Sequence, residues 1–155
     1  MGATTEIVFR KMIADDAEEV AALDLKSFGT RDAWDSDYFF YTAGVDQAEY
    51  IVGESHGKII ACAGVGFFED ASEIETIAVM PEYQRQGVGT KLFAELLDTI
   101  TARHAEMIFL EVRPSNTAAV NFYEKIGFKT VEISKNFYGD EDAYIMMKEN
   151  FSNPE

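Results

Sequence analysis

The sequence has few of the residues on which several common kinds of site depend. Its 155 residues include one cysteine and two histidines. A single cysteine excludes an internal disulfide framework, and so small a set of sulfur and imidazole ligands argues against a structural zinc site. We therefore expect no bound metal. Cys62 lies in the apolar segment 59–63, so we expect a buried thiol rather than a nucleophile.

Positive charge and long apolar runs are also scarce. Lys and Arg number 13 against 28 Asp and Glu, which gives a formal net charge of −15. Such a charge disfavours direct nucleic-acid binding, because phosphate recognition needs clustered basic residues. It suits a cationic or neutral partner, or serves solubility alone. No run of 18 apolar residues and no secretory signal occurs, so we expect no membrane span and a cytoplasmic location.

Length and pattern predict the fold class. The length and the 47% of hydrophobic residues predict one domain over residues 1–155 with a substantial core. Hydrophobic periodicity and turn residues predict the order β-α-α-β-β-β-α-β-α-β-β. That order indicates an α/β (α+β) domain with a mixed sheet, because a Rossmann fold would alternate strands and helices regularly. The predicted strands are 6–12, 50–53, 58–68, 73–79, 107–112, 128–134 and 144–148. The predicted helices begin near Asp15 or Asp16, near Asp35, near Gly87, and near Ser115 or Asn116.

The most specific local motif is Gln-Arg-Gln-Gly-Val-Gly at 84–89, between a predicted strand and the long predicted helix. Glycines let the backbone approach an anion closely, and the first amides of a helix have no intrahelical partner. Arg85 can add charge-assisted hydrogen bonds. The segment therefore indicates an anion site, although an ordinary helix that opens with glycine would have the same pattern.

Two segments together resemble the GCN5-related N-acetyltransferase (GNAT) superfamily. Residues 77–89 are similar to its acetyl-CoA motif, and residues 116–128 match its second signature, Asn-x-x-Ala-x-x-Phe-Tyr-x-x-x-Gly-Phe. Their order and separation, with the predicted element order, fit the superfamily along nearly the whole chain. The resemblance implies a mostly antiparallel mixed sheet with a splayed central strand pair. It also implies an acetyltransferase that uses acetyl-CoA as cosubstrate.

The resemblance further implies how acetyl-CoA would bind. The strand that ends at Val79 would pair its free backbone groups with the pantetheine arm, as in strand addition, and the amides of the following loop would hold the pyrophosphate. The expected cofactor-binding residues are Ile77, Ala78, Val79, Arg85, Gln86, Gly87, Val88, Gly89, Thr90, Asn116 and Tyr123.

A narrower resemblance, to the ribosomal-protein S18 alanine N-acetyltransferases, rests on segments 110–113, 136–138 and 141–146. In that subfamily the glutamate matching Glu111 accepts the amine proton through water, and the tyrosine matching Tyr123 protonates the departing thiolate. Tyrosine, with a reference pKa of about 10, holds its proton at neutral pH. The structural alternative for Tyr123 is a core aromatic, a role for which we expect Phe122 to fit better. The backbone amide of Val79 would polarise the thioester carbonyl.

Other residues compete for these roles. Glu73 falls where histone-type members carry their base, and Glu75 lies on the same strand face. Either could be the base if Glu111 were only structural, paired with Arg113 or a lysine. The candidate substrate contacts are Trp34, Glu73, Glu75 and Tyr138. Trp34 lies in a segment similar to the subfamily's Pro-Trp-Ser, with alanine in place of the proline.

The sequence thus predicts acetyl transfer to a protein N-terminal α-amine, by direct attack in a ternary complex. An α-amine, with a reference pKa of about 7.7–8.0, is an easier nucleophile than a lysine amine at about 10.4. One alternative is the same chemistry on a small amine such as a polyamine, an aminoglycoside or a metabolite. Another is a non-catalytic module that binds acetyl-CoA. The expected partners are acetyl-CoA and either a basic protein N-terminus or a small amine, and both monomer and homodimer remain open.

Overall fold

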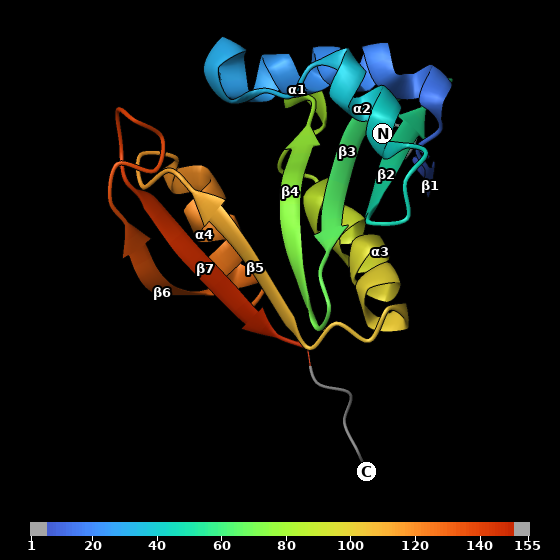
Figure 1. The fold of residues 1–155 in the computed structure, drawn as a ribbon. Helices are drawn as coiled ribbons and strands as arrows, with labels where there is room; N and C mark the ends of the chain where they lie inside the picture. The colour runs from blue at the N-terminus through green and yellow to red at the C-terminus, as the bar shows by residue number, and fades with distance from the viewer. Residues whose placement is uncertain (1–5, 151–155) are drawn as a thin grey trace.

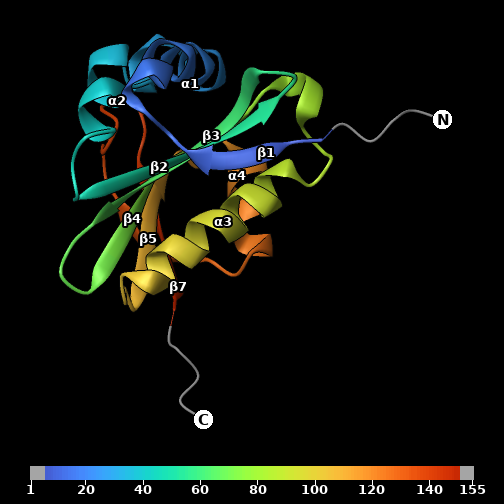
Figure 2. The same ribbon diagram turned by 90° about the vertical axis from the view of Figure 1, so that its right-hand side faces the viewer.

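The computed structural model describes residues 6–150, which form a seven-stranded mixed sheet with four α-helices (Figures 1 and 2). The predicted element order is confirmed, with two added 3₁₀ turns, 14–16 and 81–83. The helices are α1 (Ala17–Asp32), α2 (Ser36–Thr42), α3 (Val88–Ala102) and α4 (Thr117–Lys125). The strands are β1 (Val8–Lys11), β2 (Ala48–Ser55), β3 (Lys58–Phe67), β4 (Ala71–Val79), β5 (Met107–Val112), β6 (Lys129–Ser134) and β7 (Ala143–Glu149).

The helices cover both faces of the sheet and create two apolar clusters. α1 and α2 bury Val20, Leu23 and Phe39 against β2 and β3. α3 crosses the opposite face (Figure 2) and buries the predicted four-residue repeat of Val88, Leu92, Leu96 and Ile100. Full burial of such side chains stabilises a fold by about 1.5–3 kcal/mol each, so both layers contribute to the stability of the sheet.

The sheet has the order β1-β2-β3-β4-β5-β7-β6, and its single parallel pair among the described residues is β4 with β5. That pairing covers Ala71 to Glu73 on β4 and Met107 to Phe109 on β5. Beyond these residues the two strands diverge, as Figure 1 shows. The expected splayed central pair is therefore confirmed, and it leaves one edge of β4 without a strand partner over its second half.

A β-bulge on β4 changes which side chains face the α1–α2 layer. Val65 of β3 lies opposite Ile74 and Gly64 lies opposite Thr76, so Glu75 is an extra residue. Both Glu75 and Thr76 make side-chain hydrogen bonds to residues of this layer or of β2. A bulge commonly redirects a side chain beside a functional site, and here it places two consecutive polar side chains on one side of the strand.

Two helices begin at side-chain caps that the local sequence provides, whereas α1 does not. Asp35 caps α2 by accepting from the Tyr38 amide, and Asn116 caps α4 by accepting from the Ala119 amide. Asp16 stands at the first position before α1, but its carboxylate accepts from the Arg10 guanidinium and the Ile13 amide instead of capping that helix. An ion pair to a neighbouring strand thus replaces the local cap.

Candidate active site

A pocket of about 740 Å³ lies where β4 and β5 diverge. Its walls come from the end of α1, the start of α2, both central strands, α4 and the loop between β6 and β7. Ten of the residues predicted for cofactor, substrate or catalysis line this pocket: Trp34, Glu73, Glu75, Ile77, Ala78, Val79, Glu111, Asn116, Tyr123 and Tyr138. The fold thus brings residues separated by up to 104 positions to one cavity.

The backbone of β4 offers free hydrogen-bonding groups to this pocket. The Met80 amide donates to the Ile60 carbonyl at 2.8 Å, and Val79 pairs in register with Ala61. In an antiparallel ladder the residues alternate between facing the partner strand and facing away. The amides of Ile77 and Val79 therefore point away from β3, toward the gap that β5 has left.

The glycine-containing loop leads directly into α3. Arg85 has φ 62° and Gly87, the residue before the helix, has φ 82°. Arg85, Gln86, Gly87 and Thr90 are exposed, whereas the Val88 side chain is buried in the core. A Cβ on Gly89 would stand 3.3 Å from the Phe122 ring, so glycine there permits close packing against α4. The result is a helix start with unpartnered amides at the surface.

Two carboxyl groups meet at the point of divergence. Glu73 pairs in register with Phe109, and Glu111 lies two residues further along β5, on the same side of that strand. Burial, and next the contact with the Glu111 carboxyl group, raise the pKa of Glu73 to about 8. The pair as a unit therefore retains a proton at neutral pH. Arg113 binds other carboxylates, so the alternative of a Glu111–Arg113 ion pair is wrong.

Glu75, the third carboxylate of the pocket wall, is already engaged. The hydroxyl of Tyr38 donates to its Oε1 at 2.5 Å, and the hydroxyl of Tyr50 donates to the same oxygen. The bulge and the missing side chain of Gly66, where a Cβ would stand 2.6 Å from the other oxygen, make room for this carboxylate. Two tyrosine donors fix Glu75 in place, which suits it to a structural role.

Tyr123 lies in the apolar wall of the pocket. It is 9% exposed and packs edge-on against Phe122 and Phe128. Phe122 is less deeply buried, so the prediction that it is the better core aromatic is wrong. Burial raises the pKa of Tyr123 above its usual value, and the hydroxyl therefore keeps its proton at any physiological pH.

Two features of the site were not predicted from the sequence. Asp24 is 1% exposed on α1 and accepts from the Trp34 amide and the Thr76 hydroxyl, both at 2.8 Å. An acid four residues after Val20, on the apolar stripe of a helix, was a signal that could have revealed it. The partners of Arg113 are the other feature, because nothing local predicts carboxylates that lie 27 to 81 residues away.

Three other sequence predictions concern metal binding, the cysteine and membrane crossing. Within residues 6–150 no group of three or more His, Cys, Asp or Glu side chains is arranged to hold a metal ion. Cys62 is fully buried and burial raises the pKa of its thiol, which confirms the expected inert thiol. No helix in the described part of the chain is long and apolar enough to cross a membrane.

Comparisons with known proteins agree with this geometry. Residues 15–128 match the model of the Acetyltransferase (GNAT) family. A Bacillus subtilis protein, provisionally named a ribosomal protein bS18-alanine N-acetyltransferase, is 33% identical over 145 residues, which are 92% of this chain and 95% of that protein. The ribosomal protein bS18-alanine N-acetyltransferase of Escherichia coli is 42% identical over 95 residues, 59% of this chain and 64% of that protein. A crystal structure of the Escherichia coli enzyme superposes with a TM-score of 0.84 at 28% identity, over 96% of this chain and 97% of that one.

Proposed function

Because the chain belongs to the acetyltransferase (GNAT) family and is an acyltransferase, we propose that it transfers the acetyl group of acetyl-CoA to the N-terminal α-amine of a protein. The relatives named for bS18-alanine acetylation make the N-terminus of that ribosomal protein the first acceptor to test. One observation carries the proposal: the β4 amides that face away from β3, a carboxyl pair and the side chain of Tyr123 share one pocket.

Acetyl-CoA would bind through backbone groups more than through charge. The amides of Ile77 and Val79 face the gap beside β4 and would pair with the pantetheine arm. The amides at the start of α3, with Arg85, would hold the pyrophosphate. This local arrangement allows a chain of net charge −15 to bind a phosphate ligand, because the unpartnered amides act at hydrogen-bond distance.

The proton steps assign complementary roles to three side chains. Glu111 accepts, through water, the proton that the ammonium must lose before its nitrogen attacks the thioester, while Glu73 already holds a proton at neutral pH. After the attack the nitrogen of the tetrahedral intermediate loses its second proton to solvent water. The Val79 amide stabilises the oxyanion of the tetrahedral intermediate. As the carbon–sulfur bond breaks, Tyr123 gives its proton to the thiolate and regains one from solvent after product leaves. Glu75 stays bound to its two tyrosines.

The acceptor would enter between Trp34 and Tyr138. Both side chains line the pocket, and Trp34 stacks on Tyr38 with ring centroids 4.1 Å apart. The carboxylates of this wall favour an amine that arrives as a cation. A free polyamine carries the same charge, so the competing small-amine reaction is distinguished by experiment.

The experiment measures CoA release with three acceptors. These are a peptide of the bS18 N-terminus, the same peptide with an acetylated N-terminus and an internal lysine, and a polyamine panel. We expect turnover with the free N-terminus alone. Turnover restricted to polyamines would overturn the N-terminal assignment, and acetyl-CoA binding without any turnover would indicate a non-catalytic module.

Variants test the two catalytic assignments. Glu111→Gln and Tyr123→Phe should each lower kcat about 100-fold, because general base or acid catalysis contributes roughly that factor or more, while calorimetric affinity for acetyl-CoA stays unchanged. Glu95→Gln on the exposed side of α3 and Tyr41→Phe on α2, whose side chain is 66% exposed, are the matched controls. Normal turnover in both test variants would remove the mechanism.

A further inference from the structure

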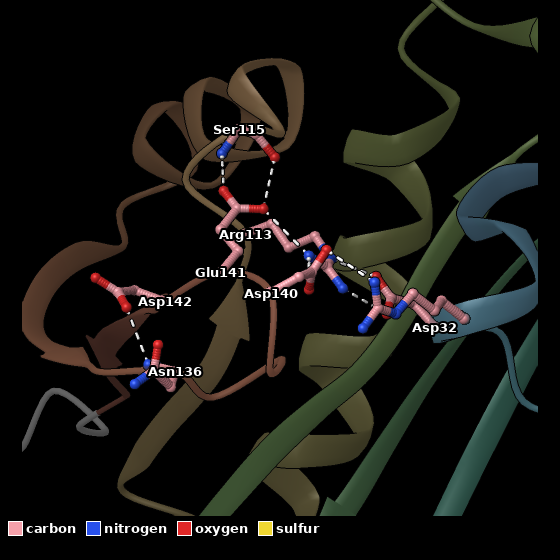
Figure 3. A network of polar contacts seen from close by, with 8 residues as sticks. Asp32, Arg113, Ser115, Asn136, Asp140, Glu141 and Asp142 are labelled. Atoms are coloured by element: carbon pink, nitrogen blue, oxygen red, sulfur yellow. Dashed lines mark hydrogen bonds and ion pairs between the residues drawn. The ribbon is translucent and has the colours of Figure 1, made fainter.

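Arg113, the residue directly after β5, binds carboxylates from two distant parts of the chain (Figure 3). Its Nε and Nη2 donate to the two oxygens of Asp32 at 2.6 and 3.0 Å. Its Nη1 donates to Asp140 at 3.0 Å and to Glu141 at 3.1 Å. The Arg113 side chain is 17% exposed. A planar guanidinium thus joins the last residue of α1 to the loop between β6 and β7, hereafter the 135–142 loop.

The same guanidinium also supports an aromatic side chain of the pocket. Its central carbon lies 4.2 Å from the centroid of the Tyr138 ring. Tyr138 belongs to the 135–142 loop and lines the pocket. Asp32 and Arg113, which lie outside that loop, line the same pocket. Stacking of this kind fixes a ring both sterically and electrostatically. The position of Tyr138 in the pocket wall therefore depends on Arg113.

Further hydrogen bonds extend the network to the start of α4. The carboxylate of Glu141 accepts from the Ser115 amide at 2.8 Å and from its hydroxyl at 2.9 Å (Figure 3). Inside the loop, the Tyr138 amide donates to the Glu141 carbonyl at 3.0 Å. The segment that carries the cofactor contact Asn116 and the segment that carries Tyr138 are thus tied together.

We propose that Arg113 is a positioning residue for the acceptor, which clamps the 135–142 loop against the end of α1 and holds Tyr138 at the pocket wall. The inference rests on the proposed function and extends it to a residue that does not itself react. Arg113 directs four hydrogen bonds to carboxylates of its own chain, so its effect on the substrate passes through Tyr138 and Asp32. Lysine cannot reproduce the two-oxygen contact or the stacking.

The test separates the Michaelis constants of the two substrates. We expect Arg113→Lys to raise KM for the acceptor peptide about tenfold, because a more mobile pocket wall no longer holds the amine in position for attack. The same substitution should change KM for acetyl-CoA less than about twofold. Asp32→Asn should raise the peptide KM in the same direction, by less, since one side of the clamp remains. Arg31→Ala is the matched control: Arg31 also pairs with Asp140, at 3.1 Å, but its side chain is 64% exposed.

A role limited to stability would give a different result. Lower Tm and a smaller active fraction with both KM values unchanged would overturn the proposal, and so would equal increases in both. Arg31→Ala should match the wild type in each KM. If Arg31→Ala raised the peptide KM and Arg113→Lys did not, Arg31 would be the positioning residue and the proposal for Arg113 would be wrong.

Hydrogen exchange tests the clamp without reference to the acceptor. In Arg113→Lys the amides of Tyr138 and Gly139, which donate within the 135–142 loop, should exchange about tenfold faster, while amides of β4 keep their rates. Should wild-type enzyme acetylate no peptide, the proposed function fails, and exchange alone then decides the clamp. Unchanged exchange in the loop would refute it.

Discussion

The carboxyl pair makes stability depend on pH in a direction that a single substitution can reveal. Glu73 has a pKa of about 8 in the folded protein against an ordinary value of 4.5, chiefly because of burial and then because of Glu111. Below pH 4.5 the side chain is protonated in both the folded and the unfolded chain. As pH rises toward 8 the unfolded chain releases this proton and the folded chain retains it, so the free energy of unfolding falls.

The size of this loss follows from the pKa difference. One pKa unit corresponds to about 1.4 kcal/mol, and the whole difference would amount to about 5 kcal/mol. Glu73 is only half-buried, so solvent screening reduces the effect to about 2 kcal/mol. Glutamine has nearly the shape of the protonated acid and does not titrate. Glu73→Gln should therefore differ from the wild type in stability by less than about 0.5 kcal/mol at pH 5 and exceed it by about 2 kcal/mol at pH 9.

Urea denaturation of both proteins at pH 5 and pH 9 measures this difference. Titrating groups outside the pair cancel in the comparison, because both chains contain them, and the measured difference therefore reports on the coupled pair Glu73–Glu111. Glu95→Gln, on the exposed side of α3, should show the same small difference at both pH values. If Glu73→Gln gave an equal change at pH 5 and pH 9, the folded and unfolded chains would bind this proton equally, and the reasoning about the pair would be refuted.

Two glycines give further predictions. Gly64→Ala should lower the free energy of unfolding by about 2–3 kcal/mol, because its Cβ would stand 2.1 Å from the buried Tyr50 ring; Gly44→Ala, whose nearest contact is 3.8 Å, is the control in the same denaturation assay. Gly87→Glu should weaken acetyl-CoA binding at least about tenfold in calorimetry, because it places a carboxylate at the proposed phosphate site. Gly57→Glu is the control: Gly57 has a similar positive φ, 75° against 82° at Gly87, and equally open surroundings in a hairpin turn, so its substitution should leave that affinity unchanged.

Several features of the fold and the site were predictable because their signals are local. The α3 helix was predicted from an apolar residue at every fourth position, and the structure buries those residues. Asp35 was predicted as a cap, and so was either Ser115 or Asn116, because a cap bonds an amide only three residues ahead; the structure confirms Asp35 and selects Asn116. The loop at 84–89 was recognised because glycines directly before a helix are a property of a short segment; the structure adds that Gly87 and Arg85 have positive φ angles.

Features that depend on distant contacts were not predictable. Asp16 carries the signal of a cap, but the approach of Arg10 from β1 gave it a stronger partner. The relative burial of Phe122 and Tyr123 depended on which side of α4 meets Phe128 and the core. Sequence spacing alone determines neither the partner of Asp16 nor the relative burial of Phe122 and Tyr123, since both depend on how separate elements pack.

The sequence by itself determined the order of the elements, the glycine loop and the presence of carboxylates and a tyrosine suited to acetyl transfer. Only the tertiary structure distinguished the carboxylates from one another. It set Glu73 beside Glu111 and raised its pKa, bound Glu75 to two tyrosines, and gave Arg113 its partners up to 81 residues away. The physical reason is that propensity and periodicity act within a few residues, whereas burial and charge pairing depend on groups that only folding brings together.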